Sequence, residues 1–315
     1  MKWLPRLIYE SDHCSKTAKK NDTIGIAAPA AAFNVEKVQK GICVLKDMGF
    51  KVDIPDGIYA RKGYLAGLDK DRARLLESLL SRDDIHAIIC ARGGYGSLRI
   101  LPYLDMSMDT ATPKRLFGFS DITPILNILA FNHGWITFHG PVMTQLADAD
   151  KKTIESFYDA LTQPFPMRMP HTDSVNVLSN GNKQSVCGRL WGGNLTTLCH
   201  TIGTPYTIDC PENILFLEDR GEAPYRIDRM LTHMRLSGYL DCVKAVLLGT
   251  FKDCGEIERI HELVLECFGD DIPVVSGFAC GHDLPNHTFP VGLWATLDLA
   301  DGSVTFCIKE CSKKS

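Results

Sequence analysis

Apolar and polar positions follow two alternating spacings along the first 140 residues of the chain. Short apolar runs of the kind that form buried strands cover residues 23–30, 50–55 and 85–90, and a fourth run precedes Ser120. Between them, residues 35–48 and 69–80 carry apolar side chains at helical spacing, and the second stretch begins with acidic residues. This β-α-β-α order predicts an α/β fold with a doubly wound parallel sheet.

A second region of strong pattern follows a weaker one. Residues 148–184 are polar and contain prolines, which we interpret as a connection between two domains. Beyond it, apolar strands at 213–219 and 245–251 flank a helix predicted over 226–237. The predicted division is therefore a short leader over 1–22, an N-terminal α/β domain over 23–147, the connection over 148–184, and a C-terminal domain over 185–315.

Composition and charge exclude several classes of partner. With 315 residues, 45% of them hydrophobic, the chain can bury one large core or two medium ones. The net charge of −4 and the lack of a long basic block indicate neither a nucleic-acid nor an anionic-membrane partner. No apolar stretch approaches the roughly 18 to 20 residues that span a bilayer, and the first residues lack the apolar region of a signal peptide. We expect a cytoplasmic protein.

The cysteines do not indicate a metal site. There are twelve, scattered mostly inside apolar runs and without a C-x-x-C pair, which is typical of reduced, buried thiols. The tightest group of ligand-type residues is Cys280-Gly281-His282, and two ligands are too few for a zinc site. We expect neither a metal nor a cofactor.

The segment Gly118-Phe119-Ser120-Asp121 joins a strand-like run to a helical one. A serine here is either the N-cap of the helix or a nucleophile displayed on a sharp strand-to-helix turn. Doubly wound sheets carry their functional groups at the carboxyl ends of the strands, and the loops at 28–29 and 92–96 fall at such ends as well. This agreement favours the nucleophile, and a serine can do both.

A serine nucleophile needs a base and a group that orients it. Glu218, Asp219 and Glu222 follow the apolar run 214–217, and Glu218 comes directly after it, either as the orienting acid or as a charge that leaves the core for solvent.

Four histidines are candidates for the base. His282 lies in a Gly/Asp/Pro-rich loop after an apolar strand, where functional side chains are commonly displayed. His287 is a rival in the same loop that fits a surface position equally well, whereas His139 and His200 stand in apolar contexts typical of structural histidines. The order serine–acid–histidine is used by one class of hydrolases.

The loop A-R-G-G-Y-G-S-L-R-I is glycine-rich without being a nucleotide motif. No G-K-[ST] follows its glycines, and Arg99 stands where a dinucleotide fingerprint has its third glycine. Consecutive glycines let backbone N–H groups converge on a ligand, so the N–H groups of Gly94 and Asp121 are candidates for an oxyanion hole.

Seven segments of the chain together resemble the L,D-carboxypeptidases (muramoyl-tetrapeptide carboxypeptidases), a family of serine peptidases that includes the microcin C immunity proteins. They occur in the family's order over 23–292: IGIAAPA, ARGGYG, GFSD, FHGPV, GRLWGGNLTTL, LFLED with YRIDRML, and GHDLPNHTFPVG. The resemblance implies a catalytic triad of Ser120, Glu218 and His282. It also implies an N-terminal domain resembling class I glutamine amidotransferases, a C-terminal swivelling β/α/β domain with barrel-like character, and a cytoplasmic homodimer that needs no metal. Nothing is transferred onto the leader.

The function that the resemblance implies is release of the terminal D-alanine from L,D-linked murein tetrapeptides in cell-wall recycling. The alternative within the family is a microcin immunity-type peptidase that cleaves peptidyl- or aminoacyl-nucleotide amides. Trp191 keeps this alternative open, because an aromatic residue stands here where the family more usually has an aliphatic residue before Gly-Gly-Asn-Leu. A glutamine amidotransferase would need cysteine at the elbow, and a non-catalytic binder would not need the triad order. Arg92, Trp191 and Asn194 are the candidates for binding the substrate, a small peptide.

Overall fold

The computed structural model of the chain describes residues 17–105, 113–170, 172, 174–208 and 212–308. The chain divides into two compact units. Unit 1 comprises the described residues up to Pro164 together with Thr288–Val291, and unit 2 comprises Phe165–His287 and the described residues from Gly292 onward. Of the predicted leader, only residues 17–22 lie within the described part of the chain.

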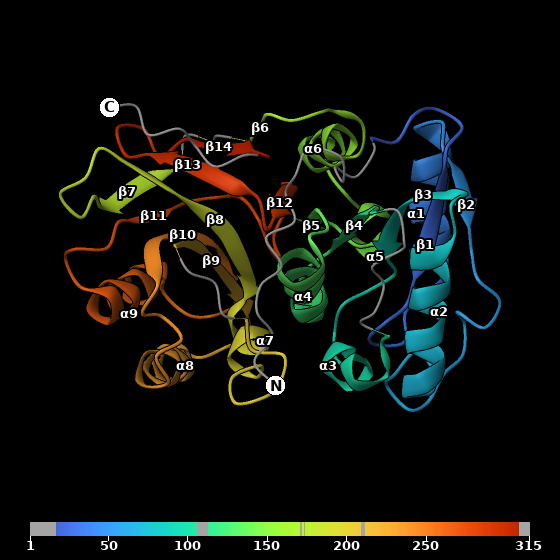
Figure 1. Ribbon diagram of the computed structural model, residues 1–315, viewed down its shortest axis with the longest axis horizontal. Helices are drawn as coiled ribbons and strands as arrows, with labels where there is room; N and C mark the ends of the chain where they lie inside the picture. The colour runs from blue at the N-terminus through green and yellow to red at the C-terminus, as the bar shows by residue number, and fades with distance from the viewer. Residues whose placement is uncertain (1–16, 106–112, 171, 173, 209–211, 309–315) are drawn as a thin grey trace. The chain divides into compact units, whose positions relative to one another are not determined.

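Unit 1 is built on a six-stranded sheet in the order β12-β5-β4-β3-β1-β2 (Figure 1). Its strands are β1 (Thr23–Ala27), β2 (Lys51–Asp53), β3 (Ile85–Cys90), β4 (Arg115–Gly118), β5 (Thr137–His139) and β12 (Phe289–Val291). All neighbours pair in parallel except β12, which runs antiparallel to β5. The predicted doubly wound parallel sheet is confirmed.

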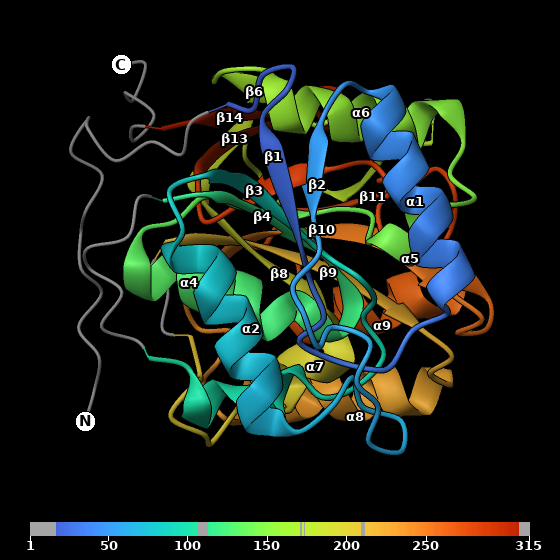
Figure 2. The same ribbon diagram turned by 90° about the vertical axis from the view of Figure 1, so that its right-hand side faces the viewer.

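The helices of unit 1 connect these strands. They are α1 (Val35–Asp47), α2 (Asp69–Ser81), α3 (Ser97–Ile100), α4 (Thr123–His133), α5 (Met143–Leu146) and α6 (Lys151–Thr162), with short 3-10 turns η1 (Leu101–Tyr103) and η2 (Ser120–Ile122). Figure 2 shows α1 and α2 on opposite sides of β1 and β2. The side chain of Asn34 caps α1, and acidic residues in the first turn of α2 face the positive end of its dipole. Every residue of α4 from Thr123 to Phe131 is buried, as its largely apolar sequence requires.

Unit 2 is built on an eight-stranded sheet in the order β6-β14-β13-β8-β9-β10-β11-β7. Its strands are β6 (Met167–Arg168), β7 (Asn176–Ser179), β8 (Ser185–Asn194), β9 (Asn213–Arg220), β10 (Val243–Lys252), β11 (Val274–Ser276), β13 (Trp294–Asp298) and β14 (Val304–Cys307), and its helices are α7 (Leu195–Cys199), α8 (Pro224–Leu236) and α9 (Ile257–Phe268). The four central strands β8 to β11 are parallel, and the outer strands pair antiparallel.

The barrel-like character expected of unit 2 is not found. Within the described residues, β6 and β7 form the two edges of the sheet, and no pairing joins them. The sheet is therefore open.

The range 148–184, predicted as a connection, contains regular elements of both units. It holds α6 in unit 1 and β6 and β7 in unit 2, and the division between the units falls after Pro164. Phe157, Ala160 and Leu161 form a buried stripe on α6. The predicted C-terminal domain over 185–315 is also not confined to unit 2, because its strand β12 joins the sheet of unit 1.

The parallel pairing explains which loops can carry a site. In unit 1 the strands β4, β3 and β1 are neighbours, so the loops that follow them leave the same edge of the sheet. In unit 2 the same holds for β8, β9, β10 and β11. No helix among the described residues is long and apolar enough to cross a membrane.

Candidate active site

Ser120 lies on a sharp turn at the carboxyl end of β4. Its φ is +60°, in the left-handed region that non-glycine residues rarely adopt, and the preceding Phe119 is fully extended. Such strained backbone is typical of functional turns, including the nucleophile elbow. Ile122, not Ser120, stands at the cap position of α4, so the N-cap interpretation does not describe this helix.

Gly118, two residues before Ser120, leaves room for the start of the next helix. A Cβ at this position would lie 2.8 Å from Cγ2 of Ile122, so a side chain would push the start of the helix away from the strand. The glycine therefore permits the tight turn by close approach.

The glycine-rich loop lies against this turn. A Cβ on Gly93 would be 3.0 Å from Cβ of Ser120 and 3.3 Å from its Oγ, so only a glycine fits beside the serine without a shift. Gly94, the predicted oxyanion donor, follows with a φ of +95°, and the peptide that carries its N–H begins at Gly93. Arg92 is exposed and donates to the carbonyl of Ala32.

Asp121, whose N–H is the second predicted donor, is held by its side chain. Its carboxylate accepts the N–H of Ser97 at 2.8 Å, and its carbonyl accepts the Ser97 hydroxyl. The residue is 4% exposed, and burial raises the pKa of its carboxyl to about 6, which the Ser97 hydrogen bonds oppose. The glycine-rich loop and the turn at Ser120 are thus joined through one carboxylate.

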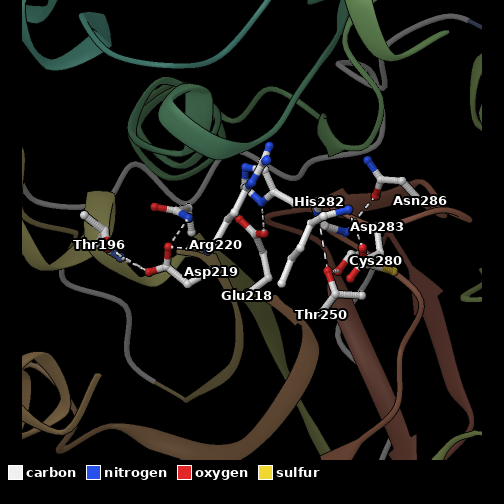
Figure 3. A network of polar contacts seen from close by, with 12 residues as sticks. Thr196, Glu218, Asp219, Arg220, Thr250, Cys280, His282, Asp283 and Asn286 are labelled. Carbon is white, nitrogen blue, oxygen red and sulfur yellow. Dashed lines mark hydrogen bonds and ion pairs between the residues drawn. The ribbon is translucent and has the colours of Figure 1, made fainter. Parts of the chain in front are cut away.

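In unit 2, Glu218 and His282 form a buried acid–imidazole pair (Figure 3). Oε2 of Glu218 lies 2.7 Å from Nδ1 of His282. Glu218 is completely buried at the carboxyl end of β9, whereas the side chain of His282 is 13% exposed. When Glu218 is ionised, its carboxylate only accepts hydrogen bonds, so the ring proton then lies on Nδ1 and Nε2 can accept a proton.

The loop after β11 fixes the imidazole. The N–H of His282 donates to Oγ1 of Thr250 at the end of β10, and the N–H of Gly281 donates to Oδ1 of Asn286. Gly281 has a φ of +129° and passes so close to the acid that a Cβ would lie 2.8 Å from Oε2 of Glu218. The Gly281-His282 pair therefore lets the backbone pass close to the carboxylate of Glu218.

Burial raises the pKa of Glu218, and the hydrogen bond and charge of His282 oppose that shift. A buried carboxylate is favourable only with such a partner. His282 thus stabilises the ionised form of the buried Glu218.

The remaining carboxylates of this segment have other partners. Asp219 accepts hydrogen bonds from Nδ2 of Asn194 and from both the N–H and the hydroxyl of Thr196, as Figure 3 shows in part. Glu222 pairs with Arg226 on the first turn of α8. Of the three acids weighed from the sequence, the structure brings Glu218 to a histidine.

Two of the three substrate-binding candidates have structural partners in unit 2. Asn194 caps α7 by accepting the N–H of Thr197, besides holding Asp219. Trp191 is 1% exposed and packs edge-to-face against Tyr239, with ring centroids 5.0 Å apart, which fits a packing role better than stacking on a ligand.

The other histidines are placed differently from their sequence interpretation in two cases. His287 is 5% exposed and its N–H donates to the carbonyl of Ala279, so it is not a surface residue. His200 is exposed at the end of α7, although its apolar context indicated a structural role. His139 is buried and stacks on Phe289, as expected of a structural histidine.

Sequence reasoning did not single out Thr250, Asn286 or Ser97. Each is a small polar residue that hydrogen-bonds a candidate site residue or its neighbour, Ser97 through two hydrogen bonds to Asp121. The sequence signal is its position in or next to an apolar strand or a candidate loop. No group of three or more His, Cys, Asp or Glu side chains in the described ranges is arranged to hold a metal ion. Cys280, next to the Gly-His pair, is completely buried, which raises the pKa of its thiol.

Comparison with known proteins identifies the family of the chain. Residues 24–140 match the LD-carboxypeptidase N-terminal domain and residues 187–297 match the LD-carboxypeptidase C-terminal domain. A probable murein peptide carboxypeptidase of Bacillus subtilis is 32% identical over 93% of this chain and 94% of its own length. The solved structure of a muramoyltetrapeptide carboxypeptidase from Oxalobacter formigenes is similar with a TM-score of 0.78 and 32% identity, covering 90% of this chain and 97% of that one. The wild-type apo structure of the microcin C7 self-immunity protein MccF, a protein known from Escherichia coli, is similar with a TM-score of 0.85 and 27% identity, covering 95% and 99%. The chain belongs to the LD-carboxypeptidase family of peptidases.

Proposed function

We propose that this protein is a serine L,D-carboxypeptidase that releases the terminal D-alanine from murein tetrapeptides. Ser120 is the nucleophile, His282 the general base and acid, and Glu218 the group that orients the imidazole. The observation that carries the proposal is the 2.7 Å contact between the buried Glu218 carboxylate and Nδ1 of His282. The relatives named as murein peptide and murein tetrapeptide carboxypeptidases support the substrate class.

In the proposed reaction, Oγ of Ser120 attacks the carbonyl carbon of the scissile amide while Nε2 of His282 takes its proton. The N–H groups of Gly94 and Asp121 stabilise the oxyanion, and Glu218 stabilises the imidazolium. The imidazolium then protonates the departing amine of D-alanine, leaving an acyl-enzyme. A water molecule, deprotonated by the same imidazole, releases the shortened peptide and restores Ser120.

A carboxypeptidase must also bind a free carboxylate. Arg92 is the candidate that the contacts favour, because it is exposed, positively charged and part of the glycine-rich loop beside Ser120. We propose in addition that the enzyme acts in the cytoplasm as a homodimer and that its chemistry requires neither a metal ion nor a cofactor.

A second candidate is an immunity-type peptidase that cleaves aminoacyl-nucleotide amides. It is supported by the likeness to MccF, whose structures include complexes with glutamyl sulfamoyl guanosine and aspartyl sulfamoyl adenosine. Both candidates use the same serine chemistry and differ in the leaving group.

Substitutions test the assignment of the nucleophile and the base. Ser120→Ala and His282→Gln should each lower kcat by about 10³-fold or more, because members of a catalytic unit fail together. His287→Gln, in the same loop, should retain kcat within about threefold, since substitutions outside the reacting groups do not remove transition-state contacts. D-alanine release measured by steady-state kinetics, with folding checked by circular dichroism, gives the ranking. Loss at His287 with activity kept at His282 would move the base to His287.

A further inference from the structure

Arg72 carries a charge inside unit 1 rather than at its surface. It lies on α2, and its side chain is 0% exposed. A buried guanidinium is unfavourable unless it is paired and hydrogen-bonded, so its partners indicate its role.

The partners of Arg72 lie in two different loops. Nη1 donates to the carbonyl oxygens of Pro29 and Gly96, the second at 2.9 Å. Pro29 belongs to the loop after β1, and Gly96 ends the glycine-rich loop after β3. One side chain therefore joins two loops at the carboxyl edge of the sheet.

The charge of Arg72 is balanced by Asp69. Nη2 of Arg72 lies 2.5 Å from Oδ1 of Asp69, whose other oxygen accepts from Nη2 of Arg99 at 2.7 Å. The hydrogen bond from Arg99, followed by that from Arg72, holds the pKa of Asp69 below its usual value. Arg99, which flanks the glycine-rich loop in the sequence, is thus engaged in a structural ion pair.

A second link leads from this loop to the nucleophile. Ser97 directly follows Gly96, and it donates its N–H and its hydroxyl to Asp121, the residue after Ser120. A continuous set of contacts therefore runs from Arg72 through Gly96, Ser97 and Asp121 to the turn that carries Ser120.

We propose that Arg72 is a positioning residue, whose guanidinium clamps the glycine-rich loop to the loop after β1 and so sets the geometry of Ser120 and of the N–H groups of Gly94 and Asp121. This inference rests on the proposed function. Gly96 also needs to be glycine here, because a Cβ would lie 2.7 Å from Cδ2 of Leu65 and 3.0 Å from Nη1 of Arg72. A planar guanidinium can serve two carbonyls and a carboxylate at once, which the single ammonium of lysine does not reproduce.

Two variants of Arg72 and one matched control test the clamp. Arg72→Met should lower kcat for tetrapeptide cleavage by about 100-fold with KM within about threefold, the size of effect expected from slight misplacement of reacting groups. Arg72→Lys should fall in between. Arg82→Met is the control, since Arg82 follows the same helix but is partly exposed and pairs with Asp53 and Asp84. It should keep native kcat.

The rate at which a fluorophosphonate labels Ser120, measured without substrate and below the unfolding temperature of each variant, gives a readout that simple loss of stability would not change. We expect labelling to slow in parallel with kcat. If Arg72→Met does not fold, Arg72→Lys and Ser97→Ala decide, and a native labelling rate in both overturns the clamp. Native labelling with no cleavage of murein peptide contradicts only the proposed substrate. Absence of labelling in the native protein contradicts the serine mechanism and the clamp together.

Discussion

The position of the His282 imidazole depends on the absence of a side chain at Gly281. The residue has a φ of +129°, and a Cβ there would lie 2.5 Å from Oγ1 of Thr250 and 2.8 Å from Oε2 of Glu218. Both atoms already bond His282, through its N–H and its Nδ1. Any side chain at position 281 therefore displaces the contacts that orient the ring.

Gly281→Ala should lower kcat by about 100-fold, because the imidazole loses its alignment. It should also lower the unfolding free energy by about 1–3 kcal/mol from backbone strain alone. Gly269→Ala is the matched control, since Gly269 has a φ of +68° but nothing within 4 Å of the added Cβ. That variant should show the strain without the loss of kcat. Steady-state kinetics and thermal unfolding of both variants give the comparison, and a Gly281→Ala enzyme within threefold of native kcat would contradict it.

The candidate residues differ in how far their sequence context predicts their place in the structure. Glu218 and His282 follow from their positions at strand ends and from the family motifs, and they lie in contact. The burial of His287 could not be foreseen, because the polar sequence Asn-His-Thr gives no sign that tertiary packing covers it. Asn194 was a binding candidate because it lies in the Gly-Gly-Asn-Leu turn that resembles the family motif, and the sequence does not show that it caps α7 and bonds Asp219.

At the level of elements, Asp121 joins η2 to the first residue of α3. Burial raises the pKa of its carboxyl from 3.8 to about 6, so the folded protein holds a proton between about pH 4 and 6 that the unfolded chain has released. The contribution of this group to stability is therefore full below about pH 4 and is lost as the pH rises through 6.

Asp121→Asn removes this titration. Relative to the native protein, the variant should gain stability as the pH rises from 4 to 7, by up to about 3 kcal/mol for two pKa units. Asp84→Asn is a control, because Arg82 lowers the pKa of the exposed Asp84, so that Asp84 titrates below this range and its substitution should change stability little between pH 4 and 7. Urea denaturation across this range measures both differences. A pH-independent difference for Asp121→Asn would contradict the shifted pKa.

The strands and helices with strong periodicity were predicted close to their observed bounds, including β1, α1, β3 and α8. Several elements were not predicted, among them α6 and β12. The helix α6 lies in a segment whose prolines and charged residues indicated a connection rather than a helix, although Phe157, Ala160 and Leu161 have helical spacing and are buried. The strand β12 has only three residues and pairs with β5, about 150 residues earlier in the chain, and such long-range pairing leaves no local signal.

For the molecule as a whole, family membership does not decide which leaving group the substrate carries. Unit 1 contains Ser120, unit 2 contains Glu218 and His282, and relatives that cover most of the chain are named for murein peptides or for microcin self-immunity. A carboxypeptidase differs from an amidase of larger conjugates in one requirement, since it must desolvate and neutralise a free terminal carboxylate.

A peptide panel therefore separates the two functions. The tetrapeptide L-Ala-γ-D-Glu-diamino acid-D-Ala should lose only its D-alanine. Its C-terminal amide should be cleaved at least about 10-fold more slowly, because loss of one charge-assisted hydrogen bond costs about 1.5–3 kcal/mol. The pentapeptide ending in D-Ala-D-Ala should resist, since its L,D bond is no longer terminal. An aminoacyl sulfamoyl adenosine, which lacks the terminal carboxylate, should be a poor substrate. Mass spectrometry of the four digests decides between the candidates, because rapid cleavage of the sulfamoyl conjugate, or equal cleavage of the amide, favours the immunity-type activity.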